Sequence, residues 1–303
     1  MLGNIVTKIY HKEGMYKNMK VTLPKKPKLN VRAIVIYTVS IIACIIAIII
    51  VALSAYFGSD ELDRLVTTGG SNVTQEDMEY QSLIENFDNI FQNRIEEYNT
   101  SISIPILDEE QPIVYTYYRT AENKQKSYVL DLNIPFINID NEEIAKYNED
   151  IKGMFEEKAN EILQTEDENI IYSVEYSATL EEDILSVIIK AELKEGSEPQ
   201  RTIVKTYNYD LKNQQEITLE EIINRKQLNK DDVQNKIEEE IRQEQARVES
   251  MKALGYSIFE RNLDDEMYKI ENTQEFFVKD GNIYIIYAYG NENLTSEMDL
   301  IIV

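Results

Sequence analysis

Hydrophobic and polar residues follow several patterns along the chain, and the first is a long run without charge. Residues 33–57, AIVIYTVSIIACIIAIIIVALSAYF, contain no Asp, Glu, Lys or Arg. At about 1.5 Å per residue, a helix of this length exceeds the roughly 30 Å hydrocarbon core of a bilayer. A cleaved secretory signal has a shorter apolar core, of about 7 to 15 residues. The pattern therefore predicts a single, uncleaved transmembrane helix over 33–57.

Two later stretches have the spacing of amphipathic helices. The first is predicted over 75–98 with Thr74 as its N-cap. Its apolar stripe consists of Leu83, Phe87, Ile90, Phe91, Ile95 and Tyr98. In the second, Asp140 is expected to be the cap and Glu143 to complete a capping box. Apolar residues then keep helical spacing over 144–162.

Around these helices the pattern is that of strands. Five strands are predicted, over 112–119, 127–139, 170–179, 183–193 and 201–211. Thr218 and Glu221 then form a capping box that opens a short helix. Asn229 starts a long, mostly polar helix. Its thin apolar stripe consists of Val233, Ile237, Ile241 and Val248.

The chain ends in a predicted hairpin, FFVKDGNIYIIYAYG, and a last strand, MDLIIV. Asp280-Gly281 suits a two-residue turn that needs positive φ. Strand periodicity places Ile283, Ile285, Tyr287 and Tyr289 on one face, and Tyr284, Ile286 and Ala288 on the other. Because both faces are apolar or aromatic, we expect an interior strand. Helices interleave with short, mostly antiparallel strands, so the predicted fold class is α+β, with packed helices.

The charges around the apolar run predict its orientation. Residues 1–32 hold eight Lys or Arg and one Glu, whereas Asp60, Glu61 and Asp63 follow the run with only Arg64. The positive-inside rule then places the N-terminus in the cytoplasm and the C-terminal part outside the cell membrane. The predicted organisation is a basic cytoplasmic segment, a transmembrane helix, a stalk, a membrane-proximal helix with a connector, and an extracytoplasmic ligand-binding domain. These parts span 1–32, 33–57, 58–74, 75–110 and 111–303.

The part beyond the basic segment is strongly acidic. Removing the +7 of residues 1–32 from the total of −24 leaves −31, with 23 basic residues against 54 acidic ones. Such a surface repels nucleic acid, whose phosphates need a basic footprint. It attracts basic proteins. Solubility alone is the other explanation of this charge, and the sequence leaves both open.

Residue types argue against catalysis in the outer domain. The single histidine, His11, and the single cysteine, Cys44, both precede it. Catalytic triads and zinc sites need these residues, so we predict no enzyme activity, no cofactor and no metal. A pair of carboxylates such as Asp264 and Glu266 would suffice for glycoside hydrolysis, but among 55 acidic residues a pair is uninformative. Candidates for exposed aromatic binding anchors are Tyr115, Tyr117, Tyr118, Tyr207 and Tyr209, and the sequence assigns none of them to a surface.

From about residue 110 to the end, the chain resembles a known extracytoplasmic domain. The matching stretches are NIPFINIDNEEIAKYNEDI, KTYNYDLKNQQEITLEEII, DDVQNKIEEEIRQEQ and EFFVKDGNIYIIYAYG. This order of elements is similar to that of lysozyme-sensing anti-sigma-V factors and of the N-terminal region of some membrane-anchored peptidoglycan deacetylases. No catalytic domain follows here, so the resemblance to the deacetylases implies no activity.

The resemblance implies a sensor of lysozyme or a similar cationic envelope ligand. In that family a short cytoplasmic segment holds a sigma factor, and lysozyme binding exposes a site for signal peptidase. The partners implied are therefore lysozyme or another basic protein outside, and a sigma factor or the inner membrane surface at residues 1–32. Ala52 and Ser54 match the −3 and −1 pattern of signal peptidase, although helix packing also explains small residues there. A structural or accessory envelope protein without a signalling role is the alternative.

Overall fold

The computed structural model describes residues 75–97, 103–124, 127–165 and 169–303. The chain divides into two units, 1–72 and 73–303, and every described residue belongs to the second. The predicted cytoplasmic segment, transmembrane helix and stalk lie outside the described residues. Within the described ranges, no helix is both long and apolar enough to cross a membrane.

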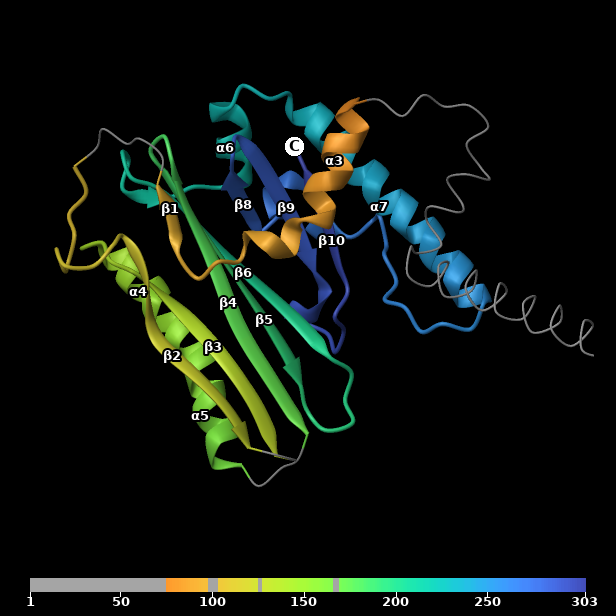
Figure 1. Cartoon of the computed structure of the whole chain (residues 1–303). Helices are drawn as coiled ribbons and strands as arrows, with labels where there is room; N and C mark the ends of the chain where they lie inside the picture. The colour runs from red at the N-terminus through yellow and green to blue at the C-terminus, as the bar shows by residue number, and fades with distance from the viewer. Residues whose placement is uncertain (1–74, 98–102, 125–126, 166–168) are drawn as a thin grey trace, which may run out of the picture. The chain divides into compact units, whose positions relative to one another are not determined.

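The larger sheet has seven strands within the described ranges (Figure 1). Its main path is β2 (Val114–Lys124), β3 (Tyr128–Ile137), β4 (Ile170–Glu181), β5 (Ile184–Lys194), β6 (Arg201–Asp210) and β7 (Gln215–Glu216). Strand β3 pairs with β4 in parallel, and the short β1 (Ile95–Glu97) also lies parallel to β4. The other pairs on the path are antiparallel. The five strands predicted between 112 and 211 are thus confirmed as β2 to β6.

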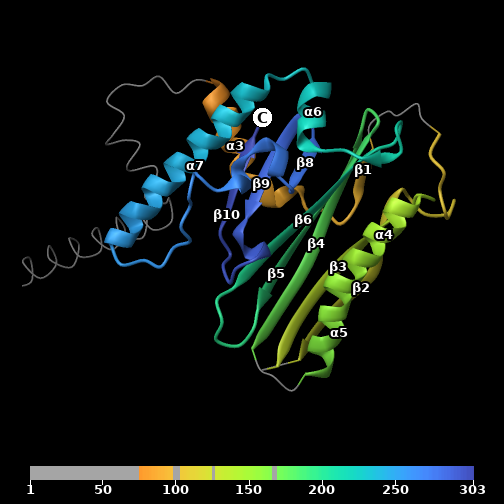
Figure 2. The same cartoon turned by 180° about the vertical axis from the view of Figure 1, so that it is seen from behind.

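The parallel β3–β4 pair requires a crossover, and a helical segment supplies it. This segment consists of α4 (Glu142–Ile151), a π-helical turn (Lys152–Glu156) and α5 (Glu157–Gln164), and it follows one face of the sheet (Figure 2). Its apolar residues pack into the core beneath that face, as their helical spacing predicts. The cap, however, is Asn141, whose side chain accepts from two backbone N–H groups of the first turn. Asp140 precedes the cap, and its backbone N–H donates to the Pro105 carbonyl.

A second sheet of three antiparallel strands lies in the order β10–β9–β8. Their bounds are Met298–Ile302, Asn282–Ala288 and Phe276–Lys279. Helices α6 (Leu219–Arg225) and α7 (Lys230–Ala253) precede it, followed by short 3₁₀ turns at Glu266–Tyr268 and Ile270–Asn272. A third 3₁₀ turn, Tyr289–Asn291, lies between β9 and β10. Thr218 with Glu221 and Asn229 form the predicted caps of α6 and α7. All four residues of the predicted α7 stripe are buried.

Strand β9 is the interior strand that its composition predicts. The predicted face of Ile283, Ile285, Tyr287 and Tyr289 packs in one core cluster with α6 and α7. The side chains of Tyr284, Ile286 and Ala288 point to the other face and pack in a separate cluster. The turn before it has φ of 53° at Asp280 and 81° at Gly281, as a tight hairpin of this type needs. Strand β9 therefore lies between two hydrophobic core clusters, one on each of its faces.

The predicted helix over 75–98 is wrong in its second half. Helix α3 ends at Glu85, a 3₁₀ turn follows at Phe87–Ile90, and the chain then enters β1. The reason is tertiary pairing. Asn93 adopts φ of 53°, and its backbone N–H and side-chain oxygen bond the backbone of Tyr176 on β4. Phe87, Ile90 and Phe91 still become buried, but against the second sheet.

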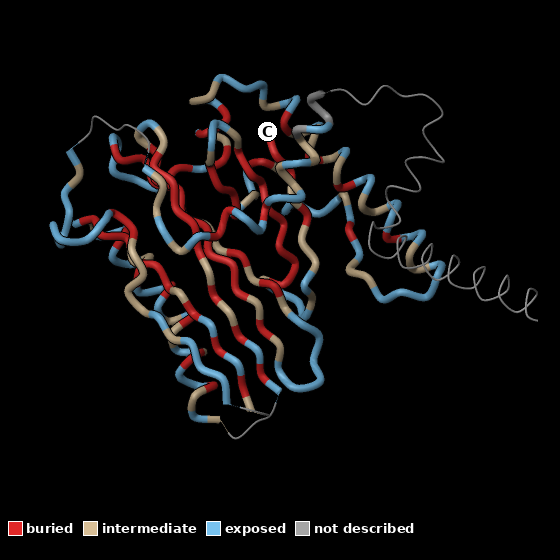
Figure 3. Tube along the Cα trace, in the orientation of Figure 1, coloured by how far each residue is buried: buried red, intermediate tan, exposed pale blue. Residues whose placement is uncertain are grey.

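Burial changes along the large sheet. The first half of β4 alternates between buried and less buried residues, because α4 and α5 cover only one face there (Figure 3). Its second half is buried on both faces, where the second sheet packs on the other side. The predicted α+β class, with mostly antiparallel strands and packed helices, is confirmed. Residues 75–97 belong to the same unit as 111–303.

Candidate functional site

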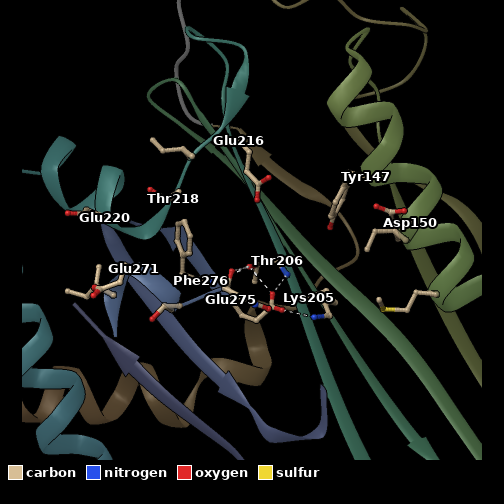
Figure 4. Close-up of a pocket in the computed structure, with 16 residues that line it drawn as sticks. Tyr147, Asp150, Lys205, Thr206, Glu216, Thr218, Glu220, Glu271, Glu275 and Phe276 are labelled. Atoms are coloured by element: carbon tan, nitrogen blue, oxygen red, sulfur yellow. Dashed lines mark hydrogen bonds and ion pairs between the residues drawn. The ribbon is translucent and has the colours of Figure 1, made fainter. Parts of the chain in front are cut away.

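An open cleft of about 560 Å³ lies where α4, strand β6 and the segments around α6 and β8 approach one another (Figure 4). The walls come from parts of the chain that are far apart in sequence. Five carboxylates and one lysine are among the lining residues: Asp150, Glu216, Glu220, Glu271, Glu275 and Lys205. The cleft therefore has an excess of negative charge.

Glu275 forms the floor of the cleft beside the open edge of β6. Its carboxylate accepts from Lys205 Nζ at 2.8 Å, from the Thr206 backbone N–H at 2.7 Å and from the Thr206 hydroxyl at 3.1 Å. Only 7% of Glu275 is exposed, and the nearby lysine balances its charge. Glu275 thus closes the edge of the sheet and positions the floor of the cleft.

The remaining carboxylates differ in how they are balanced. Lys230 pairs with Glu220 at 2.8 Å and lies 3.9 Å from Glu271. Asp150 and Glu216 form no ion pair with any lysine or arginine in the described ranges. Burial raises the pKa of Glu216, and repulsion from the carboxylate of Glu143 adds to this effect. A cation in the cleft would relieve this repulsion.

Tyr147 lies on α4 and points toward the strand that holds Lys205 and Thr206 (Figure 4). Its hydroxyl is buried and has no hydrogen-bond partner in the described ranges. Burial, followed by the charges of Glu275 and Glu216, raises its pKa, so the hydroxyl stays protonated at neutral pH. The site therefore combines unpaired carboxylates with an aromatic ring and a hydroxyl.

The tyrosines of the terminal hairpin have a structural role. Tyr289 donates to Asp299, and its oxygen lies 2.8 Å from that of Tyr268. Arg261 forms two hydrogen bonds with Asp299, at 2.7 and 3.1 Å, and its guanidinium stacks 4.8 Å above the Tyr289 ring. These four residues are each at most 7% exposed, and Tyr287 also bonds to Thr273. This cluster holds β10 and the loop after α7 to the hairpin.

The structure places the candidate tyrosine anchors at different depths, and the signal-peptidase candidates are not among its described residues. Ala52 and Ser54 lie outside the described residues. Tyr115, Tyr117 and Tyr118 are half-buried on β2. Tyr207 and Tyr209, two of the candidates for exposed anchors, are buried, because their face of β6 points into the main core.

The neighbouring carboxylates that the sequence offered as an acidic pair lie outside the cleft. Asp264 and Asp265 precede the 3₁₀ turn Glu266–Tyr268, and Glu266 begins it; all three residues are exposed, and none of them lines the cleft. In the described ranges, no group of three or more His, Cys, Asp or Glu is arranged to hold a metal. The cleft residues Asp150, Glu216 and Glu275 had no distinguishing signal in the sequence, because acidic residues are abundant throughout it.

Comparison with solved structures finds partial similarity to proteins of the DUF3298 family. A DUF3298 family protein from Pseudomonas aeruginosa PAO1 is 7% identical, with a TM-score of 0.27, over 40% of this chain and 57% of that chain. A family member from Bacteroides fragilis is 12% identical, with a TM-score of 0.32, over 58% of this chain and 80% of that chain. No protein-family model and no curated protein matches the sequence.

Proposed function

We propose that this chain is a single-pass, membrane-anchored sensor whose extracytoplasmic domain binds lysozyme or a similar cationic envelope ligand. The domain has no catalytic role, and the protein acts in the manner of an anti-sigma-factor-type sensor. The principal support is the acidic cleft, in which Asp150 and Glu216 have no cationic partner among the described residues. The charge of −31 beyond residue 32 would steer a basic protein toward it.

The family resemblance supports the same proposal. Three of the four stretches that resemble lysozyme-sensing anti-sigma-V factors supply lining residues to the cleft, namely residues 133–151, 205–223 and 275–290. The basic leader and the apolar run at 33–57 support an orientation with the domain outside. Residues 1–32 would then bind a sigma factor or the inner membrane surface. The alternative is that the protein binds no such ligand and is a structural or accessory component of the envelope.

Lysozyme binding by the purified full chain tests the proposal. We expect saturable binding that weakens as salt rises from about 50 to about 150 mM, because salt screens attraction between exposed charges. Reversing charge at two exposed residues of the cleft, Asp150→Lys with Glu271→Lys, should weaken binding by roughly tenfold or more. Glu109→Lys with Glu110→Lys changes the net charge equally at an exposed loop outside the cleft.

The control pair should weaken binding by less than about threefold. Equal losses of lysozyme affinity in the cleft variant and the control variant would show that overall charge, and not the cleft, determines binding. Absence of saturable binding by the unaltered chain at about 150 mM salt would remove the lysozyme proposal and leave the structural one. Release of soluble fragments from peptidoglycan by the chain would contradict a non-catalytic role.

Two cellular experiments test the membrane arrangement. A reporter that works only outside the membrane should be active when fused after Val303 and inactive at Met1, and the reverse result would contradict the orientation. If the sensor proposal holds, lysozyme should also trigger a cut near Ser54. Ser54→Trp should block that cut and leave lysozyme binding unchanged, because signal peptidase requires a small residue there.

A further inference from the structure

Three tyrosines form a row behind the wall of the cleft. Tyr147 of α4 stacks on Tyr207 of β6, with ring centroids 4.2 Å apart and planes within 22°. Tyr207 in turn lies 6.1 Å from Tyr209, again with nearly parallel rings. Tyr207 and Tyr209 are 6% and 1% exposed, and Tyr147 lines the cleft directly. The row therefore extends from the cleft into the core.

All three hydroxyl groups are buried and have no hydrogen-bond partner in the described ranges. Buried polar groups in folded proteins almost always have a partner, since leaving one unsatisfied is unfavourable. Phenylalanine at the same positions would preserve the stacking without this cost. Only Tyr147 lines the cleft, and the row of three unsatisfied hydroxyls begins at its wall, which indicates a polar group bound there.

Two carboxylates next to the row specify the charge of that group. The Glu216 backbone N–H donates to Glu143 at 3.4 Å, which brings the two acidic residues together at the start of α4 and in β7. Neither carboxylate forms an ion pair with a described lysine or arginine. Burial and repulsion from Glu143 raise the pKa of Glu216, which a bound cation would reverse.

We propose that this wall of the cleft binds the guanidinium group of an arginine side chain from a basic protein. The inference rests on the proposed function and specifies the chemistry of the ligand. A guanidinium is planar and has several N–H donors, so it can donate to Glu216 and to the hydroxyl oxygen of Tyr147 together. A metal ion would be held less well, because no group of three metal-ligating residues occurs in the described ranges.

Short peptides provide the direct test with the purified full chain. We expect the blocked peptide Gly-Gly-Arg-Gly-Gly to bind saturably in a calorimetric titration at low ionic strength. The same peptide with citrulline in place of arginine is neutral and nearly identical in shape, and it should not bind. Equal binding of the two peptides would overturn the proposal, because charge is then irrelevant. Tighter binding of a lysine peptide or of spermidine would show a general ammonium site and would also overturn it.

Two variants test the assignment of residues. Glu216→Gln should weaken arginine-peptide binding by about tenfold, because it removes a charged hydrogen-bond acceptor. Tyr147→Phe should weaken it by roughly two- to tenfold, and should leave the melting temperature unchanged or higher. The control Glu198→Gln removes the same charge from an exposed loop and should change affinity by less than about twofold.

The outcomes separate this inference from the proposed function. If lysozyme binds the unaltered chain, but Glu216→Gln and Tyr147→Phe bind the peptide as the control does, the proposed function stands and this site is wrong. If the peptide binds with the expected losses but no basic protein does, the site stands and the sensor proposal fails. Calcium or magnesium binding that disappears in Glu216→Gln, without peptide binding, would replace the arginine site with a metal site.

Discussion

Two groups of buried tyrosines occupy this domain, and they differ in what their hydroxyl groups contact. In the first, Tyr268 and Tyr289 bond to each other, and Asp299 and Arg261 complete the network. In the second, the hydroxyls of Tyr147, Tyr207 and Tyr209 have no partner in the described ranges. The rings are similarly buried and stacked in both groups. Burial of an aromatic ring alone therefore does not distinguish a structural cluster from a binding wall.

The hydrogen bonding of the hydroxyl groups does distinguish the two groups of tyrosines. A satisfied network in a low-dielectric core holds specific segments together, here β10 and the loop after α7. Burial opposes the charge of Arg261, but Asp299 and Glu297 outweigh it and raise the pKa of the guanidinium. In the second group, Glu143 and Glu216 repel each other, and burial with this repulsion raises the pKa of Glu216. The first group is complete by itself, whereas the second is completed by a ligand in our proposal.

The largest expected effect is in the first group. Arg261→Met should lower the free energy of unfolding by about 3–5 kcal/mol, because it leaves Asp299 and Glu297 without their cation. Arg242→Met is the control, since Arg242 pairs with Glu239 on the exposed side of α7, and it should cost less than about 0.5 kcal/mol. Urea unfolding measures both. Equal values for the two variants would show that the Arg261 network contributes nothing specific.

Replacement of a tyrosine by phenylalanine should affect the free energy of unfolding differently in the two groups. Tyr289→Phe removes a hydrogen bond to a charged acceptor and should lower the free energy of unfolding by about 1.5–3 kcal/mol. Tyr207→Phe removes a hydroxyl without a partner and should change it by less than about 0.5 kcal/mol, or raise it. Thermal unfolding of the ligand-free chain compares them. A large loss in Tyr207→Phe would mean that its hydroxyl has a structural partner.

The smallest effect is a pH dependence in the second group. Because the pKa of Glu216 is raised in the folded state, the native protein binds this proton more tightly than the unfolded chain. The stabilisation from this proton is present at low pH and is lost as the pH rises through the folded-state pKa. Glu216→Gln should therefore raise the melting temperature at pH 7, and the gain should shrink toward pH 4. A gain that grows at low pH would contradict the stated repulsion.

Much of the fold follows from local sequence. The alternation in 282–289 predicted a strand with two covered faces, and its side chains enter two different core clusters. The capping residues Thr218 and Asn229 begin the helices that they predicted. These features depend on interactions within a few residues, so a local pattern is sufficient. The end of α3 was missed because its determinant is the pairing of Asn93 with Tyr176, 83 residues away.

The cleft could not be predicted in the same way. Tyr147, Glu216 and Glu275 come from a helix, an edge strand and a loop, and each looks like an ordinary residue in its own segment. Tyr207 could be named only as a candidate for an exposed anchor, because a strand pattern does not say which helix covers which face. Its position under α4 depends on the parallel β3–β4 crossover.

The sequence by itself determined the α+β class, most element boundaries, the acidic charge and the interior hairpin. These follow from periodicity, capping and composition, which act over short distances along the chain or over the chain as a whole. Only the tertiary structure decided which tyrosine hydroxyls have partners and which carboxylates share a wall. Hydrogen-bond partners must lie within about 3 Å, and that distance depends on register and packing between segments far apart in sequence.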